Sequence, residues 1–234
     1  MIHNLPSVSS TLDHLHDLAQ QGAGSGTVVV ADEQLAGRGT RGRTWHSPRG
    51  GLWLSILYRG PGTAVELLSL RLGLAVTETI ERVVGDVGIG LKWPNDLMLG
   101  DRKLGGLLCE ARWQGPVLAW VAVGLGLNLA NPIPADVAAT AVRLDAVVPG
   151  AGPAQLVEPI AAALRALPVG DPALSAEELA AFQRRDWLRG RDLIEPVPGR
   201  ADGIEPDGRL RIVRADGTVA RAGTGHVVLA PGPR

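Results

Sequence analysis

Hydrophobic and polar positions follow two different periods along the first half of the chain. Leu12, Leu15 and Leu18 recur at helical spacing, and Ser10 or Thr11 can cap the helix that they predict. Runs of β-branched and aromatic residues predict strands instead. The pattern predicts helices over residues 10–21 and 64–84, and strands over residues 27–32, 52–58, 88–93, 104–113 and 117–127.

In the second half of the chain, the pattern of hydrophobic and polar residues changes near Trp187. Before this residue, helical patterns cover 135–147, 154–167 and 175–187, the last with a capped start at Ser175. After it, short alternating runs are separated by Pro-Gly and Asp-Gly turns, which predict a small antiparallel barrel over residues 190–230. We therefore expect an α+β fold, with a mixed sheet and flanking helices over residues 1–187 and a small β-barrel over residues 188–234.

Composition narrows the class of protein. The 234 residues carry a net charge of -1 and only eight Phe, Trp and Tyr side chains, which argues against a general nucleic-acid binder. The single cysteine, Cys109, excludes an internal disulfide and fits a reducing compartment. No signal-peptide pattern opens the sequence, and the apolar stretch 117–130 is too short to span a membrane. The composition favours a cytoplasmic protein.

Lysine is almost absent from the chain. Of the 23 basic residues, Lys92 and Lys103 are the only lysines, and they lie in the short stretch KWPNDLMLGDRKLGG. Codon bias is one explanation for this distribution. The other is that the stretch requires a compact ammonium group where arginine would not serve.

The segment Gly37–Trp45 combines glycines with cations. Its glycines let the backbone fold closely around a ligand, and Arg38, Arg41 and Arg43 can offer forked donors to phosphate or carboxylate groups. Trp45 can stack on a base. A solvated basic loop has the same composition, so the segment alone does not identify a site.

Polar side chains follow the predicted strands. Asn95 and Asp96 come after Pro94 and are suitable oxygen ligands for Mg²⁺ held with substrate phosphates, although the same residues are common in turns. Lys103 precedes two glycines and can neutralise reacting anions, or lie on the surface beside a bulge. Asn128 ends the apolar run GLGL, where it can bind a ligand oxygen or simply terminate a strand.

Taken in order, the segments GRGxRGRxW, KWPND, KLGG and GLGLN over residues 37–128 resemble the biotin protein ligases. The resemblance extends to Ser10-Thr11, to Gln34 and to the predicted C-terminal barrel. It implies a catalytic domain similar to class II aminoacyl-tRNA synthetases and an SH3-like barrel. It also implies a two-step reaction, in which biotin and ATP form biotinoyl-AMP and pyrophosphate before a lysine of a biotin carboxyl carrier domain is acylated.

The resemblance implies specific roles for individual residues. It implies catalytic roles for Lys103, Arg38 and Asp96, the last to orient or deprotonate the acceptor lysine. It implies biotin contacts from Ser10, Thr11, Gln34, Gly37, Arg38, Gly39, Thr40, Lys103 and Gly106. It implies ATP or adenylate contacts from Arg38, Arg41, Arg43, Trp45, Asn95, Lys103 and Asn128, with Mg²⁺ at Asn95 and Asp96.

The chain departs from the family pattern at two positions. Leu12 stands where the family usually has an asparagine that contacts the biotin ring. Thr40 stands where bacterial members usually carry an arginine that helps to retain the adenylate. Loss of one charge-assisted contact, about 1.5 to 3 kcal/mol, leads us to expect faster escape of biotinoyl-AMP.

Two other functions fit the same residues. A lipoate or octanoate protein ligase is a related enzyme, and Leu12 favours this alternative because it makes the site less polar. A biotin-binding sensor without turnover is compatible with the changes at Leu12 and Thr40. Because the Ser-Thr motif lies near the first residue, we expect a short form without direct DNA binding. A homodimer through the central sheet is possible in the family, with the strand 117–123 as either an edge or an interior strand.

Overall fold

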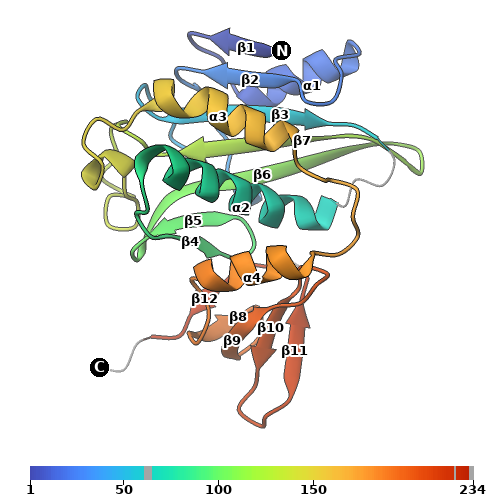
Figure 1. The fold of residues 1–234 in the computed structure, drawn as a ribbon, viewed down its shortest axis with the longest axis vertical. Coiled ribbons are helices and arrows are strands. Elements are labelled where there is room, and N and C mark those ends of the chain that lie inside the picture. The colour runs from blue at the N-terminus through green and yellow to red at the C-terminus, as the bar shows by residue number, and fades with distance from the viewer. Residues whose placement is uncertain (61–64, 224, 232–234) are drawn as a thin grey trace.

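The computed structural model describes residues 1–60, 65–223 and 225–231 of the chain. In this part a seven-stranded sheet with helices on both faces is followed by a smaller five-stranded sheet (Figure 1). The predicted α+β fold with a mixed sheet and a small C-terminal β-domain is confirmed. Residue 64 of the predicted helix, and residues 224 and 232–234 of the predicted C-terminal domain, lie outside the described residues.

The large sheet places the two longest strands at its centre. In spatial order it contains β1 (Ile2–Leu5), β2 (Val28–Ala31), β3 (Leu52–Tyr58), β7 (Val117–Leu127), β6 (Arg102–Gln114), β5 (Asp96–Leu99) and β4 (Ile89–Lys92). β1 and β2 are parallel, and the remaining neighbours are antiparallel. β7 is therefore an interior strand over Val121–Leu127, where β3 and β6 pair with it on either side, whereas Val117–Trp120 pairs with β6 alone. The homodimer stays a prediction.

Alternation along the strands divides the core between the two faces of this sheet. Val28 and Val30 of β2 belong to the large core beneath α2 (Val65–Val84) and α3 (Pro153–Arg165), whereas Val29 packs with α1 (Thr11–Gln20). Figure 1 shows α2 and α3 together over one face of the sheet. None of the helices in the described ranges has both the length and the apolarity needed to cross a membrane.

The smaller sheet is built from hairpins. Its spatial order is β11 (Val219–Ala222), β10 (Leu210–Val213), β9 (Gly199–Ile204), β8 (Asp192–Glu195) and β12 (Val228–Leu229). Gly208 and Gly217 have φ values of 81° and 80°, as the turns predicted at the Asp-Gly pairs require. Trp93 Nε1 donates to the carbonyl of Gly208 at 2.9 Å and so joins the two sheets. The predicted boundary at 187 falls between α4 (Ala176–Arg185) and β8, and it stays a prediction.

One predicted element is wrong, and two strands were not predicted. The helix predicted over residues 135–147 is wrong: the segment forms turns and a short 3₁₀ helix at Leu144–Ala146. Its backbone pairs instead with β6, because Lys103 N–H donates to the carbonyl of Thr140 at 2.7 Å and Val142 N–H donates to that of Lys103 at 3.0 Å. β1 and β5 were not predicted; both are only four residues long, and β5 follows directly on the Pro94 turn.

Candidate active site

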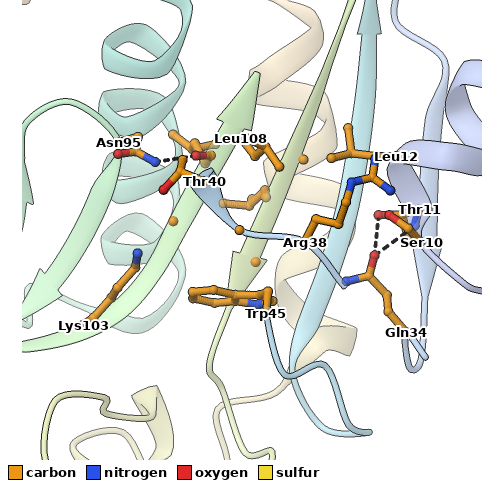
Figure 2. Close-up of a pocket in the computed structure, with 16 residues that line it drawn as sticks. Ser10, Thr11, Leu12, Gln34, Arg38, Thr40, Trp45, Asn95, Lys103 and Leu108 are labelled. Atoms are coloured by element: carbon orange, nitrogen blue, oxygen red, sulfur yellow. Dashed lines mark hydrogen bonds between the residues drawn. The ribbon is translucent and has the colours of Figure 1, made fainter. Parts of the chain in front are cut away.

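A cavity opens where β6 and β7 meet the start of α1 and the Gly37–Trp45 loop (Figure 2). Residues from these four segments, distant in sequence, line it together. Ten of the predicted site residues are among them: Ser10, Thr11, Gln34, Arg38, Gly39, Thr40, Trp45, Asn95, Lys103 and Gly106. In Figure 2, Ser10, Thr11 and Gln34 lie at one end of the cavity, and Asn95 and Lys103 lie at the other.

Hydrogen bonds at the Thr11 end run in one direction. Thr11 donates to Gln34 Oε1 from its backbone N–H at 2.9 Å and from its hydroxyl at 3.0 Å. The hydroxyl has then used its only hydrogen, so Ser55 Oγ must be the donor in their 2.7 Å contact. Gln34 Nε2 donates to Ser47 Oγ at 2.8 Å and keeps a second hydrogen that a ligand can accept. These bonds fix the orientation of the Gln34 amide.

Ser10, Ser47 and Ser55 show what the sequence did and did not predict at this end. Ser10 occupies the N-cap of α1, but its side chain makes no capping hydrogen bond; it is buried at the cavity wall instead. Ser47 and Ser55 were not among the predicted site residues. The position of Ser55 inside the apolar run LWLSILY was the available signal, since a buried hydroxyl requires a partner.

An apolar wall faces this polar end. Leu12 is 3% exposed and lines the cavity together with Leu108 and Leu125. A Cβ at Gly124 would lie 3.0 Å from Leu12 Cδ1, so the first glycine of GLGL makes room for this leucine. The departure from the family pattern at Leu12 therefore lies in the cavity wall itself.

Trp45 lies across β7 because of the second glycine in the same motif. A Cβ at Gly126 would lie 2.4 Å from Trp45 Nε1, which the indole could not accommodate without moving. The Trp45 Nε1–H group is buried without a hydrogen-bond partner in the described part of the chain. Lys103 Nζ lies 5.2 Å from the centroid of the same ring. A ligand in the cavity can thus meet the Trp45 ring and an ammonium together.

Lys103 is held by a carboxylate. Its Nζ lies 2.5 Å from Asp96 Oδ1, and a Cβ at Gly106 would lie 3.2 Å from that Nζ and 3.4 Å from the carboxylate oxygen. A glycine at this position therefore relieves crowding around the ion pair. Asn95 Nδ2 donates to the carbonyl of Leu107 at 2.7 Å, which leaves the amide oxygen of Asn95 for another partner.

Two further hollows adjoin this cavity, and Thr40 and Lys103 line all three. The second hollow is lined by Trp45, Arg43 and Asn128 among others. The third is lined by residues of β4, the β4–β5 turn and the C-terminal segment, including Arg41, Arg43, Lys92, Asp96, Trp187 and His226. Lys103 thus stands where three separate spaces meet.

The remaining predicted residues fall around, rather than in, the first cavity. Arg41, Arg43, Asp96 and Asn128 line the adjoining hollows. Gly37 lines none of the three; a Cβ there would lie 2.4 Å from the carbonyl oxygen of Trp45, so its place in the motif is explained by packing.

Lys92, the second lysine, lies in the wall of the third hollow. Its Nζ is 5.4 Å from the centroid of the Trp187 ring. Burial lowers the pKa of Lys92, and the nearby charge of Asp96 partly opposes that shift. The two lysines of the chain therefore lie near the same carboxylate, as their closeness in sequence suggested.

Asn131 was not predicted, yet it orients a predicted residue. Its Nδ2 donates to Asn128 Oδ1 at 3.2 Å, and its own Oδ1 accepts from Leu129 N–H at 3.1 Å. The Asn128 side chain is thereby left with its amide hydrogens for the second hollow. Spacing of three residues between the two asparagines was the only sequence signal for this pair.

Comparison with known proteins decides the family. Residues 5–128, which contain every predicted site residue, match the Biotin/lipoate A/B protein ligase family. The chain belongs to this family. The resemblance to biotin protein ligases drawn from the motifs is confirmed.

Members of the ligase family with curated names match part of the chain. The bifunctional ligase/repressor BirA of Escherichia coli (strain K12) is 41% identical over 130 residues, which are 54% of this chain and 40% of that protein. The biotin--[acetyl-CoA-carboxylase] ligase of Paracoccus denitrificans is 40% identical over 106 residues, 44% of each chain. The matched segments thus span less than half the length of these relatives.

A solved structure extends the ligase likeness to the C-terminal sheet. The biotin protein ligase from Aquifex aeolicus, in complex with biotin and ATP, aligns with a TM-score of 0.79 and 25% identity. The alignment covers 98% of both chains. The small five-stranded sheet therefore belongs to the shared fold.

Proposed function

We propose that the protein is a biotin protein ligase that uses ATP to form biotinoyl-AMP and then acylates a lysine of a biotin carboxyl carrier domain. The observation that carries this proposal is the meeting of three hollows at Thr40 and Lys103. A ligase of this kind must bring an acid, a nucleotide and an acceptor amine to one point. We assign the first cavity to the acid, the second hollow to the nucleotide and the third hollow to the acceptor amine.

The first step requires two anions to approach. An oxygen of the biotin carboxylate attacks the α-phosphorus of ATP, and the bond from that phosphorus to the bridging oxygen breaks, so that pyrophosphate leaves. Lys103 lies at the junction of the acid and nucleotide spaces, where its ammonium offsets the repulsion between carboxylate and phosphate. Trp45 forms a wall common to both spaces.

The intermediate is a mixed anhydride and must be kept from water. The loop around Thr40–Gly42 is suited to cover it, because this short 3₁₀ segment lies largely exposed at the border of all three hollows. Arg41 has a φ of 61°, the one positive value at a non-glycine residue in the described ranges. We expect the loop to close over the bound adenylate and to bring Arg41 and Arg43 toward its phosphate.

The second step requires an amine without its proton. The acceptor lysine would enter the third hollow, attack the acyl carbon of the adenylate and release AMP. Asp96 lines this hollow and is the carboxylate next to Lys103, so we assign to it the orientation of the amine and acceptance of its proton. Lys92 lines the same hollow as Asp96.

The oxygen donors at this point fit Mg²⁺ that is shared with substrate phosphates. Asp96 Oδ1 is engaged by Lys103, which leaves Asp96 Oδ2 and the amide oxygen of Asn95. Within the described ranges no group of three or more His, Cys, Asp or Glu side chains could hold a metal alone. Mg²⁺ commonly uses one or two protein oxygens together with phosphates, and there it neutralises developing phosphate charge. We propose that Asn95 and Asp96 supply the protein oxygens.

A lipoate or octanoate ligase is the second candidate, and one observation favours it. Leu12, Leu108 and Leu125 give the acid cavity an apolar wall, which suits an alkyl chain as well as a biotin ring. The polar Thr11–Gln34 end favours biotin, because the amide hydrogen left on Gln34 can meet a ureido oxygen. The family description names both biotin and lipoate ligases.

The deciding experiment measures pyrophosphate release from ATP and Mg²⁺ with biotin, lipoate, octanoate or no acid. Wild type and Lys103→Ala should be compared. We expect release with biotin that is lost in the variant. Release with lipoate or octanoate alone would support the second candidate. Binding of biotin without release with any acid would indicate a sensor and would contradict the proposed reaction.

A further inference from the structure

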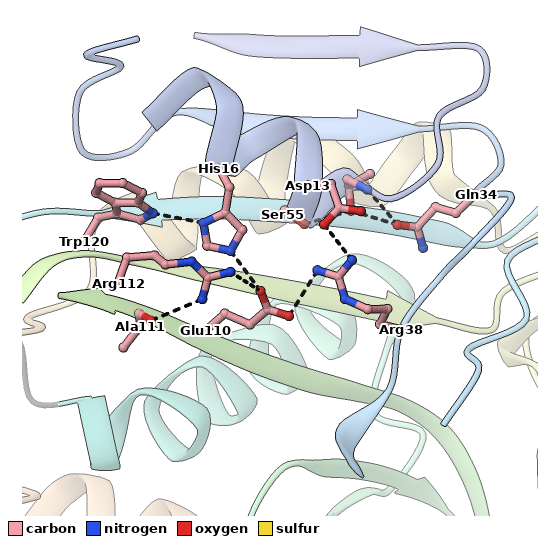
Figure 3. A network of polar contacts seen from close by, with 10 residues as sticks. Asp13, His16, Gln34, Arg38, Ser55, Glu110, Ala111, Arg112 and Trp120 are labelled. Atoms are coloured by element: carbon pink, nitrogen blue, oxygen red, sulfur yellow. Dashed lines mark hydrogen bonds and ion pairs between the residues drawn. The ribbon is translucent and has the colours of Figure 1, made fainter. Parts of the chain in front are cut away.

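Arg38, which lines the first cavity, forms ion pairs with two carboxylates (Figure 3). Its Nη1 lies 2.6 Å from Asp13 Oδ1, in the first turn of α1, and its Nη2 lies 3.1 Å from Glu110 Oε1, on β6. Neither carboxylate lines the cavity. A guanidinium has five N–H donors in one plane, so two such contacts fix the plane and leave three donors for a ligand.

Glu110 is the more strongly held of the two carboxylates. Its side chain is 19% exposed, against 49% for Asp13. Glu110 Oε2 also contacts His16 Nε2 at 2.9 Å and, more loosely, Arg112 Nη2 at 3.4 Å. The hydrogen bond from His16 lowers the pKa of Glu110 most, burial opposes it, and Arg38 lowers it further, to about 2. Glu110 is therefore a fixed anion at neutral pH.

The histidine behind Glu110 is fixed in turn by Trp120. Trp120 Nε1–H donates to His16 Nδ1 at 3.0 Å, and an indole N–H can only donate. His16 Nδ1 must therefore be the acceptor, which places the ring hydrogen on Nε2, where it points at Glu110. Both rings are buried, at 6% and 7% exposure. A series of one-way hydrogen bonds thus runs from Trp120 through His16 to Glu110.

The loop that carries Arg38 has few comparable attachments. In the described ranges neither Arg41 nor Arg43 forms an ion pair, and the Arg43 side chain donates hydrogen bonds only to Thr40, at 3.4 and 3.5 Å. Arg38 lies at the base of the loop, where Gly39 N–H donates to the carbonyl of Arg43 at 2.7 Å and closes the turn. Arg38 is thus the one arginine of this loop whose side chain is held by ion pairs before a ligand binds.

On these grounds we propose that Glu110, fixed by His16 and Trp120, is a positioning residue that presents Arg38 to the acid carboxylate. This proposal rests on the proposed ligase function for the identity of that carboxylate. A guanidinium already held in place need not be ordered when the ligand binds, so its remaining N–H groups meet the carboxylate at a lower entropic cost.

The test compares Glu110→Gln with Arg112→Gln. The first removes the negative charge and leaves one acceptor oxygen for the two donors Arg38 and His16, and the second removes the outer cation that touches the same carboxylate but does not line the cavity. Both change one charge in the same cluster. For biotin-dependent pyrophosphate release we expect Glu110→Gln to lower kcat/KM by about ten- to a hundredfold, mainly through a higher KM for biotin, and Arg112→Gln to stay near wild type.

A second pair of variants separates positioning from general stability. His16→Gln keeps an N–H donor at a similar reach, whereas His16→Leu does not. We expect the glutamine variant to retain most of the wild-type affinity for biotin and the leucine variant to behave like Glu110→Gln. Two results would show a purely structural role and overturn the proposal. One is an equal effect of the two His16 variants on the affinity for biotin, and the other is a lower melting temperature of His16→Leu with an unchanged KM for biotin.

NMR makes the result independent of turnover. Restricted rotation of the Arg38 Nη2 group in the wild type, lost in Glu110→Gln while Asp13 still holds Nη1, is the expected result, together with a His16 ring protonated at Nε2. Free rotation of the Nη2 group in the wild type would refute the positioning role. If the wild type releases no pyrophosphate with any acid, the ligase proposal fails, and calorimetric biotin affinities of the same four variants then decide the positioning role.

Discussion

Arg71 and Arg38 are both bound to glutamates, but they do different work in the molecule. Arg71, on α2, has a side chain that is 1% exposed; it donates to Glu178 Oε1 and to the carbonyls of Asp171 and Ala173, each at 2.8 Å. Arg38 is 34% exposed and has donors to spare at a cavity. A buried arginine whose contacts are all internal stabilises the fold, whereas one that is only partly satisfied at a cavity is available to a ligand.

Removal of Arg71 should have the largest effect of any change considered. Arg71→Ala would remove the three hydrogen bonds that this charged group makes, and a hydrogen bond to a charged group contributes about 1.5 to 3 kcal/mol. We expect a loss of that order in the free energy of unfolding, measured by denaturant titration. Activity per folded molecule should be unchanged. An unfolding free energy equal to that of the wild type would contradict the structural role given to Arg71.

Removal of Arg38 should have the opposite profile. Arg38→Ala should lower kcat/KM for biotin-dependent pyrophosphate release by about a hundredfold, because one preorganised charged donor at the reacting groups is lost. Its free energy of unfolding should fall by no more than about 1 kcal/mol, since the ion pairs are partly exposed. Arg38→Lys should remain impaired, because an ammonium cannot hold both carboxylates in one plane.

A third arginine can be added to the loop to sharpen the contrast. Thr40 borders all three hollows and has no carboxylate partner among the described residues. Thr40→Arg should add one charge-assisted contact to the adenylate and reduce its escape by about tenfold or more. Labelling of a lysine-rich bystander protein measures that escape. Labelling as strong as in the wild type would contradict the hypothesis about Thr40.

The smallest expected effect concerns pH. The folded-state pKa of Glu110, about 2, is lower than its ordinary value of 4.5, so ionised Glu110 stabilises the fold above pH 4.5. That contribution is lost as the pH falls from 4.5 toward 2. The difference in unfolding free energy between wild type and Glu110→Gln should therefore shrink across this window. A constant difference would show that the carboxylate is not specifically stabilised in the folded state.

Sequence patterns predicted residues that line the first cavity, but not the residues that hold them in place. Ser10, Thr11, Gln34, Arg38 and Lys103 were predicted because they belong to short segments with distinctive order. Glu110 and Asp13 were not identified, because their role depends on which strand faces which helix. The alternation on β6 places Glu110 on the same side as Gly106, but the pattern does not state that α1 covers that side.

The fold was predicted where length or turns gave clear signals. The capped helix from Ser175 and the hairpins of the small sheet follow local chemistry, and both are present. The helix predicted over 135–147 failed because Thr140 and Val142 pair with Lys103, a contact between distant segments that outweighs local preference. β1 and β5 are too short to give a periodic signal.

The positions of the two lysines have a consequence for any amine-directed chemistry. Lys92 rests against Trp187, and Lys103 is held between Trp45 and Asp96. All other cationic side chains that can carry a permanent charge are guanidinium groups, which do not form stable amides with activated acids under mild conditions. A protein that generates an acylating agent would thus offer that agent few nucleophiles of its own, and the acyl group would remain available to whatever lysine enters from outside.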